Sequence, residues 1–266
     1  MKTISIINLK GGVGKSISAI NIAHILVTVH KKRVLLIDND KQGNVSKFFG
    51  VHDYEKPSIS DVLTGRKSMY NAMCHTKYED LYIIPSNMNL LTADREILLD
   101  VSRPQQTRLQ KALKEFGQSG IICDYCIIDN APDINMSVIN ALVASQDVLV
   151  PIKVDKFAFD GLSQLVDQIE DIKEFNPLLR LCGCFITMDS HYNVNLQGAE
   201  WLENNTEYPL FQTSIRKTCK IDETTFNGKP ILEYAKNSNA AKDYVRLVDE
   251  YLQKWGYGGV IDEKNA

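Results

Sequence analysis

A glycine-rich segment with two lysines and a serine stands near the start of the chain: Lys10-Gly11-Gly12-Val13-Gly14-Lys15-Ser16. Glycines allow backbone N–H groups to close around phosphate oxygens. Lys15 would place a point charge at the β- and γ-phosphates of a nucleotide, and the Ser16 hydroxyl is a suitable ligand for Mg²⁺. The segment from Lys10 to Ile17 is therefore predicted to bind ATP with Mg²⁺.

The segments on either side of this loop are of the kind that would position it. An isoleucine-rich strand is predicted at Thr3–Asn8, and an amphipathic helix is predicted at Lys15–Val29. A helix that begins at the loop points its positive end at the phosphates. The simpler alternative is a glycine-rich turn with a chance lysine, but the loop, the Lys-Ser pair and both flanking elements agree on the nucleotide site.

Apolar runs and helix-period segments alternate along the rest of the chain. This pattern predicts an α/β fold with a mainly parallel twisted sheet and helices on both faces. We expect one domain over residues 1–256, polar loops and short helices over Val51–Met73, and a flexible tail over residues 257–266. Further strands are predicted at Arg33–Ile37, Leu81–Pro85, Tyr125–Asp129, Asp147–Pro151 and Leu181–Thr187, and helices at Asn135–Ala144, Phe159–Phe175 and Asn239–Trp255.

The composition favours a cytoplasmic protein. The formal net charge is -3, so any affinity for DNA must come from a local basic patch. The chain has six cysteines but neither a signal peptide nor an apolar run of transmembrane length, which predicts reduced thiols. Cys123 and Cys126 are expected on opposite faces of a strand, whereas Cys182 and Cys184 are expected on the same face. Neither pair has partners at zinc-like spacing.

Acidic residues follow two of the predicted strands. Asp38 and Asp40 come at the end of the Arg33–Ile37 run, and Asp129 ends the Tyr125–Asp129 run. The carboxyl ends of parallel strands meet at one edge of a sheet, where folds of this class bind their ligands. The alternative is that these acids simply begin solvated loops.

Three segments together resemble the ParA/MinD ATPases. The loop resembles their deviant Walker A motif, because Leu9 stands where the common phosphate loop has glycine and Lys10 precedes the paired glycines. The segment Val34–Asn44 resembles the family's second nucleotide motif, usually D-x-D-P-Q-G-N. The segment Tyr125–Pro132 resembles its Walker B strand, usually ending D-x-P-P. The resemblance extends over nearly the whole chain.

The resemblance implies roles for individual residues. Lys10 would reach the phosphates of the partner across a nucleotide-sandwich homodimer, and Lys15 would serve those of its own subunit. Asp40 would position the attacking water, completing the catalytic set. Ser16, Asp38 and Asp129 would serve the magnesium side. ATP would favour the dimer, and slow hydrolysis would release it.

Three departures from the family pattern leave the hydrolysis rate and the nucleotide affinity open. Ile17 replaces a second hydroxyl residue, so a contact to the α-phosphate is expected to be lost. Lys41 replaces a proline in the second motif. Asn130-Ala131 replaces the x-P part of the Walker B ending. None of the three removes a residue that the chemistry requires.

The C-terminal third is the candidate DNA-binding region. No helix-turn-helix precedes the first strand, so the chain is similar to the short ParA type. This similarity implies nonspecific DNA binding by the ATP dimer, a position at the nucleoid and a ParB-like activator. From Arg216 to Lys242, six basic residues stand against three acidic ones, a local charge of +3. Arg216, Lys217 and Lys220 are the DNA-contact candidates, and a solvated charged face is the alternative.

Two other classes share a related loop. A MinD-like membrane ATPase would need a C-terminal amphipathic helix with a basic face. The glycines and acids after Trp255 argue against one, so we expect no membrane contact. An iron–sulfur reductase of the nitrogenase iron-protein kind would need a cysteine shortly after Asp129, and the sequence there is Asn-Ala-Pro-Asp-Ile-Asn.

Overall fold

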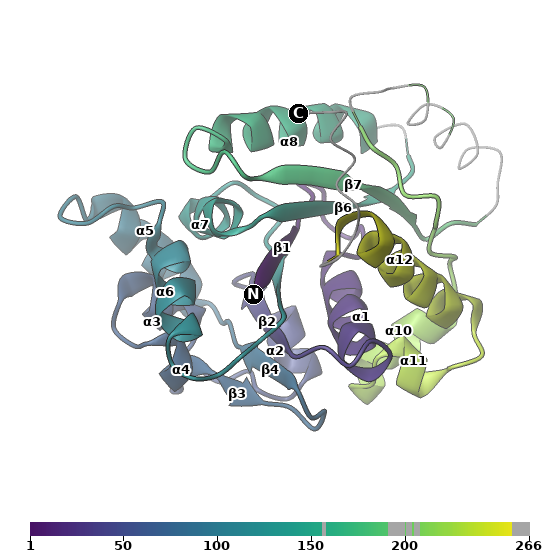
Figure 1. The fold of residues 1–266 in the computed structure, drawn as a ribbon, viewed down its shortest axis with the longest axis horizontal. Helices are drawn as coiled ribbons and strands as arrows, with labels where there is room; N and C mark the ends of the chain where they lie inside the picture. The colour runs from purple at the N-terminus through teal and green to yellow at the C-terminus, as the bar shows by residue number, and fades with distance from the viewer. Residues whose placement is uncertain (156–157, 191–199, 201–203, 205–207, 257–266) are drawn as a thin grey trace.

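A single sheet organises the structure, a computed structural model that describes residues 1–155, 158–190, 200, 204 and 208–256. Its seven strands have the order β3-β4-β2-β5-β1-β6-β7 (Figure 1). Neighbouring strands are parallel except for β3 and β4, which are antiparallel. The α/β prediction with a mainly parallel sheet is therefore confirmed. The expected flexible tail, residues 257–266, lies outside the described residues.

The elements have these bounds. The strands are β1 (Lys2–Ile6), β2 (Val34–Asn39), β3 (Cys74–His75), β4 (Leu81–Ile84), β5 (Tyr125–Asn130), β6 (Asp147–Lys153) and β7 (Arg180–Thr187). The helices are α1 (Lys15–Thr28), α2 (Asn44–Phe48), α3 (Ile59–Thr64), α4 (Met69–Ala72), α5 (Asn89–Leu99), α6 (Arg108–Gly117), α7 (Met136–Ala144), α8 (Ala158–Ile172), α10 (Cys219–Asn227), α11 (Ile231–Tyr234) and α12 (Asn239–Trp255).

The central strands explain the continuous apolar runs of the sequence. Every residue of β2 and of β5 is buried, because helices cover the sheet on both faces. Successive side chains of a strand point to opposite faces. Leu36 accordingly packs in the cluster under α1, whereas its neighbours Leu35 and Ile37 pack in the cluster under α3, α5, α6 and α7.

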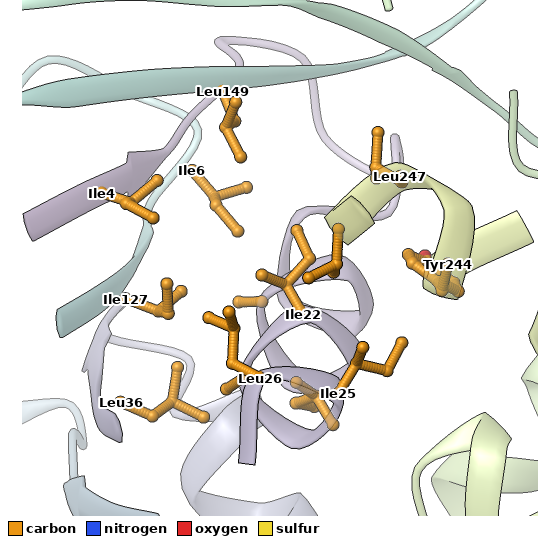
Figure 2. Packing of buried hydrophobic residues seen from close by; sticks show 14 of the residues in the cluster. Ile4, Ile6, Ile22, Ile25, Leu26, Leu36, Ile127, Leu149, Tyr244 and Leu247 are labelled. Atoms are coloured by element: carbon orange, nitrogen blue, oxygen red, sulfur yellow. The ribbon is translucent and has the colours of Figure 1, made fainter. Parts of the chain in front are cut away.

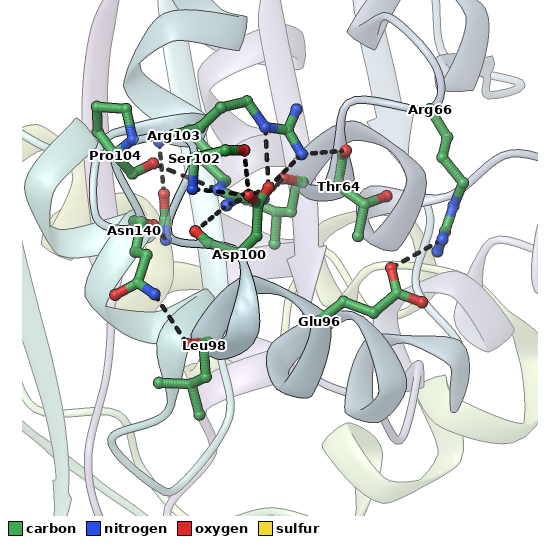
Figure 3. A network of polar contacts seen from close by, with 12 residues as sticks. Thr64, Arg66, Glu96, Leu98, Asp100, Ser102, Arg103, Pro104 and Asn140 are labelled. Atoms are coloured by element: carbon green, nitrogen blue, oxygen red, sulfur yellow. Dashed lines mark hydrogen bonds and ion pairs between the residues drawn. The ribbon is translucent and has the colours of Figure 1, made fainter.

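Helices α1 and α12 cover one face of the sheet together. Figure 2 shows Ile22 and Leu26 of α1 directed at the strands, whereas Ile25 lies on the side toward Tyr244. Tyr244 and Leu247 of α12 pack in the same cluster, and each is about 1% exposed. The apolar stripe of the last helix is thus buried inside the protein.

A buried carboxylate joins the first strand to the last helix. Asp147, at the start of β6, accepts a hydrogen bond from the Tyr251 hydroxyl at 2.6 Å and pairs with the Lys2 ammonium at 2.9 Å. The Lys2 ammonium also donates to the backbone carbonyl of Trp255. The beginning of the sheet and the end of α12 are therefore held side by side.

One expectation about strand faces is wrong. Cys182 packs in the cluster under α1 and α12, but Cys184 packs in the cluster under α7 and α8. The pairing of β6 with β7 shifts register between Val148 and Leu149, and Gly183 has a φ of 152°. This irregularity reverses the alternation of faces, which the sequence spacing alone does not reveal.

Candidate nucleotide-binding site

The glycine loop lies between β1 and α1, as the sequence predicts. Gly12 and Gly14 have φ values of 71° and 87°, a backbone conformation that glycine adopts without strain. Helix α1 begins at Lys15, and Gly14 at its N-cap offers no side chain to the first turn. The N–H groups of that turn are therefore available to an anion.

Two residues that the sequence analysis missed support this loop. The Asn8 amide donates to the Pro151 carbonyl at 2.9 Å and accepts from the Lys10 N–H at 2.9 Å. The Thr187 hydroxyl, at the end of β7, donates to the Val13 carbonyl at 2.8 Å. Asn8 stands two residues before Lys10, so its position was a signal. Thr187 is 174 residues away from Val13, and nothing local marks it.

The two loop lysines occupy different surroundings. Lys15 is 7% exposed, and its ammonium donates to the Lys10 carbonyl at 3.0 Å. Burial lowers the pKa of Lys15, while the charges of Asp129 and Asp40 oppose that shift. The Lys10 side chain is 34% exposed and forms an ion pair with Asp155. Lys15 thus points into the site, and Lys10 lies at its surface.

Asp38 and Asp129 are direct neighbours across the β2–β5 ladder. Asp38 is fully buried and accepts hydrogen bonds from the Ser46 hydroxyl at 2.6 Å, the Ser46 N–H at 2.8 Å and the Asp40 N–H at 3.3 Å. Burial raises the pKa of Asp38 to about 6. Its carboxylate shapes the loop that follows β2.

Asp129 has the surroundings of a cation ligand. Both of its carboxylate oxygens are buried, and no hydrogen bond within the described part of the chain fully satisfies them, although the nearby Ser16 hydroxyl partly stabilises the charge. Burial raises the pKa of Asp129 well above its usual range, and the neighbouring Asp38 adds to that shift. An unpaired buried carboxylate is costly unless a cation compensates it. Because Mg²⁺ is typically held by one or two carboxylates plus phosphates, these residues fit the ion.

Asp40 lies on the turn after β2, at the same edge of the sheet. It is 7% exposed, and its carboxylate accepts from the Gln42 N–H at 2.9 Å. Its charge acts on both Lys15 and Asp129. The structure therefore brings the predicted loop and all three predicted acids together at the carboxyl ends of β1, β2 and β5.

Comparison with known proteins decides the family. A family model described as an AAA domain matches residues 1–181. The sporulation initiation inhibitor protein Soj of Bacillus subtilis is 33% identical over 252 residues, which cover 94% of this chain and 97% of Soj. The chromosome partitioning protein ParA of Caulobacter vibrioides is 31% identical over 257 residues, which cover 96% of this chain and 95% of ParA. The chain belongs to the ParA/MinD family of P-loop ATPases.

A solved structure of similar fold carries the ligands that this site fits. Cobyrinic acid a,c-diamide synthase from Mycobacterium smegmatis, with bound ATP analogue and magnesium, superposes with a TM-score of 0.82. It is 28% identical, and the match covers 97% of each chain.

The departures from the ParA/MinD pattern have clear places in the structure. Ile17 is partly buried against the cluster under α1, so it serves packing. Asn130 is fully buried, and its amide accepts from Asn39 at 2.9 Å and donates to the Ser5 hydroxyl at 3.2 Å. Lys41 lies 3.3 Å from Asp133 on the loop after β5. Asn130 and Lys41 therefore connect neighbouring nucleotide motifs of this ParA/MinD ATPase.

The three DNA-contact candidates differ in environment. Arg216 is 27% exposed and donates to the Asp243 carboxylate from Nε at 2.8 Å and from a terminal nitrogen at 2.6 Å. Lys220 pairs with Glu223 at 2.8 Å. Lys217 is exposed. The hollow beside Arg216 is also lined by Asp249 and Glu250, so the local positive charge is partly compensated.

The described residues bear on two features that the sequence analysis considered for other classes. Cys123 and Cys126 are buried free thiols, and no group of three His, Cys, Asp or Glu side chains gathers there as a metal centre. No helix in the described ranges is long and apolar enough to cross a membrane. The apolar stripe of α12 packs inside the protein.

Proposed function

We propose that this chain is an ATP-switched partition protein that moves or positions a plasmid, a mobile element or a chromosome. ATP would promote a sandwich homodimer that binds DNA nonspecifically at the nucleoid in the cytoplasm, and slow hydrolysis, stimulated by a ParB-like activator, would release it. The observation that carries the proposal is the second loop lysine, Lys10, at the surface beside the phosphate loop. The names of the relatives Soj and ParA support the partition role.

The chemistry follows from positioning and charge. Phosphoryl transfer asks a protein mainly to align the reactants and to stabilise charge. Lys15 would bind the β- and γ-phosphates from within the subunit, and Asp40 would orient the attacking water. Ser16 and Asp129, with Asp38 supporting the site, would hold Mg²⁺, which supplies further positive charge to the phosphates. None of these residues is an obvious general base for the attacking water, so turnover should be slow.

Lys10 is the residue that would favour a dimer on electrostatic grounds. Lys15 already serves the phosphates of its own subunit, so a second lysine on the loop is redundant in a monomer. Two triphosphates brought together across a two-fold axis repel each other strongly. One Lys10 from each subunit would offset that repulsion. The Lys10 ammonium is held by Asp155 in this structure, so binding across the dimer would have to draw it away from this carboxylate.

Lys10→Ala tests this proposal. The variant should bind ATP within about tenfold of the parent, equivalent to about 1.4 kcal/mol, but should not dimerise. Light scattering with a non-hydrolysable ATP analogue measures the dimer. Lys173→Ala is the matched control, because Lys173 is also a partly exposed lysine paired with an acid. If Lys10→Ala dimerises normally, the sandwich-dimer proposal is refuted, and only a general ATPase function is left.

A further inference from the structure

Two loops of the nucleotide site are joined by contacts that use none of its acids. The Asn39 amide, at the end of β2, donates to the Asn130 side-chain oxygen at 2.9 Å and to the Ser137 carbonyl at 3.0 Å. All three residues are fully buried. The strand end that precedes Asp40 is therefore tied to the strand end after Asp129 and to the first turn of α7.

An exposed ion pair also joins the loop after β2 to the loop after β5, closer to the protein surface. The Lys41 ammonium lies 3.3 Å from an Asp133 carboxylate oxygen, and the two side chains are 30% and 46% exposed. The other oxygen of Asp133 accepts from the Asn135 amide at 2.8 Å. Asn135 in turn caps α7 by accepting from the Val138 N–H at 2.9 Å. Asp133 is thus fixed to the start of a helix, and Lys41 is held against it.

The charges around Lys41 fit the same arrangement. Asp94 of α5 is 7% exposed and accepts from the Ser137 N–H at 2.7 Å, so it too is anchored at the start of α7. The positive charge of Lys41 acts on Asp94 as well as on Asp133. A proline, usual at this position in the family, can make neither interaction. The contact is therefore a property of this chain and not of the general motif.

We propose that Lys41 and Asp133 are positioning residues for ATP hydrolysis. Their ion pair fastens the loop that carries Asp40 to the loop that follows Asp129, so the water-orienting group keeps its place relative to the magnesium side. The inference rests on the proposed role of Asp40 in hydrolysis. It needs no contact between Lys41 and the nucleotide, so it predicts an effect on turnover and not on ATP binding.

The test separates turnover from binding. Lys41→Met and Asp133→Asn should each lower kcat about two- to fivefold, because exposed ion pairs are weak, and should leave KM within about twofold. The double variant should be no slower than either single variant, since the two residues act as one unit. Salt screens exposed charges. Raising the salt concentration from about 50 to about 500 mM should therefore lower the kcat of the parent protein toward the kcat of the variants.

A matched pair and a charge reversal control for nonspecific effects. Lys56→Met and Asp53→Asn remove an exposed Lys–Asp pair of 3.5 Å that joins neighbouring residues of one loop, and kcat should not change. Lys41→Asp combined with Asp133→Lys restores the pair in reverse and should recover at least half of the lost kcat. This reversal keeps the inference testable even if a single variant folds poorly.

The outcomes distinguish this inference from the proposed function. If Asp40→Ala hydrolyses ATP at the parental rate, the role of Asp40 fails, and the inference fails with it. If Asp40→Ala is inactive while Lys41→Met keeps the parental kcat at every salt concentration, only the inference fails. The inference would also be overturned if the kcat decreases of the two single variants add in the double variant, or if the substitutions change KM alone.

Discussion

Replacing Arg216 with methionine removes the guanidinium that neutralises a buried carboxylate. Asp243 is only 3% exposed, and Arg216 donates to both of its oxygens, at 2.6 and 2.8 Å. Arg246 offers a distant substitute, with its nitrogen 3.8 Å from Asp243. We therefore expect the variant to lose stability, although Arg216 was selected from the sequence as a DNA contact.

The size of the loss follows from the burial of Asp243. Removing one partner of a buried ion pair costs about 3–5 kcal/mol. The arginine is 27% exposed, so solvent screens part of the pair and the lower limit, about 3 kcal/mol, applies. For a chain of this size, each kcal/mol shifts Tm by about 2–4 °C, which gives a decrease of about 6–12 °C.

Thermal unfolding measures this decrease, and Lys217→Ala is the matched comparison. Lys217 is exposed, so its loss should change stability by less than about 0.5 kcal/mol. If Lys217 contacts phosphate, the same substitution should weaken binding to every duplex alike and reduce the salt slope by about 0.9. Arg216→Met with Asp243→Asn should recover at least half of the lost Tm, because no unpaired charge remains buried.

The opposite pattern would refute this reasoning. If Arg216→Met melts within about 2 °C of the parent but binds all duplexes more weakly with a flatter salt slope, Arg216 is a DNA contact and not a structural residue. If neither Arg216→Met nor Lys217→Ala alters DNA binding, the footprint lies elsewhere.

Three further substitutions test the nucleotide site. Lys15→Ala should abolish ATP binding in calorimetry, and an unchanged affinity would place the phosphates elsewhere. Asp40→Ala should still form ATP-dependent dimers but stop releasing phosphate, so parental phosphate release would remove its role. Thr187→Val leaves the Val13 carbonyl without its hydrogen bond of 2.8 Å and should weaken ATP binding about fivefold, or about 1 kcal/mol. Thr187→Ser keeps the hydroxyl and should bind like the parent; an equal loss in both variants would exclude the loop-supporting role.

The nucleotide loop could be predicted because its information is local. Glycines with positive φ, a strand before them and a helix after them are all encoded within a few residues of Lys15. The edge where Asp38 and Asp129 meet was also predictable, since parallel strands align their carboxyl ends. The register that makes these two acids direct neighbours came only from the structure.

The contacts that support the site join segments that are distant in the sequence, so no local sequence pattern predicts them. Thr187 contacts Val13 of the loop although the two residues are 174 positions apart. Lys10 pairs with Asp155, which is 145 positions away. Arg216 shows the opposite error. Its basic neighbours suggested a solvent-facing patch, but the buried carboxylate of Asp243 on α12, 27 residues later, neutralises its charge. Local charge density indicates a surface only when the partners of each charge are known.

The packing of α12 on α1 has a consequence for synthesis on the ribosome. Helix α1 is complete by Thr28, but the helix that covers its apolar side ends at Trp255, roughly 230 residues later. At about 5–20 residues per second, α1 waits roughly 10–50 seconds for that cover. During this interval the surface that α12 will bury, around Ile25 and around Ser18, whose hydroxyl lies 3.0 Å from that of Tyr244, is open to chaperones or to other nascent chains. Messages truncated within α12 would release chains that keep this surface exposed.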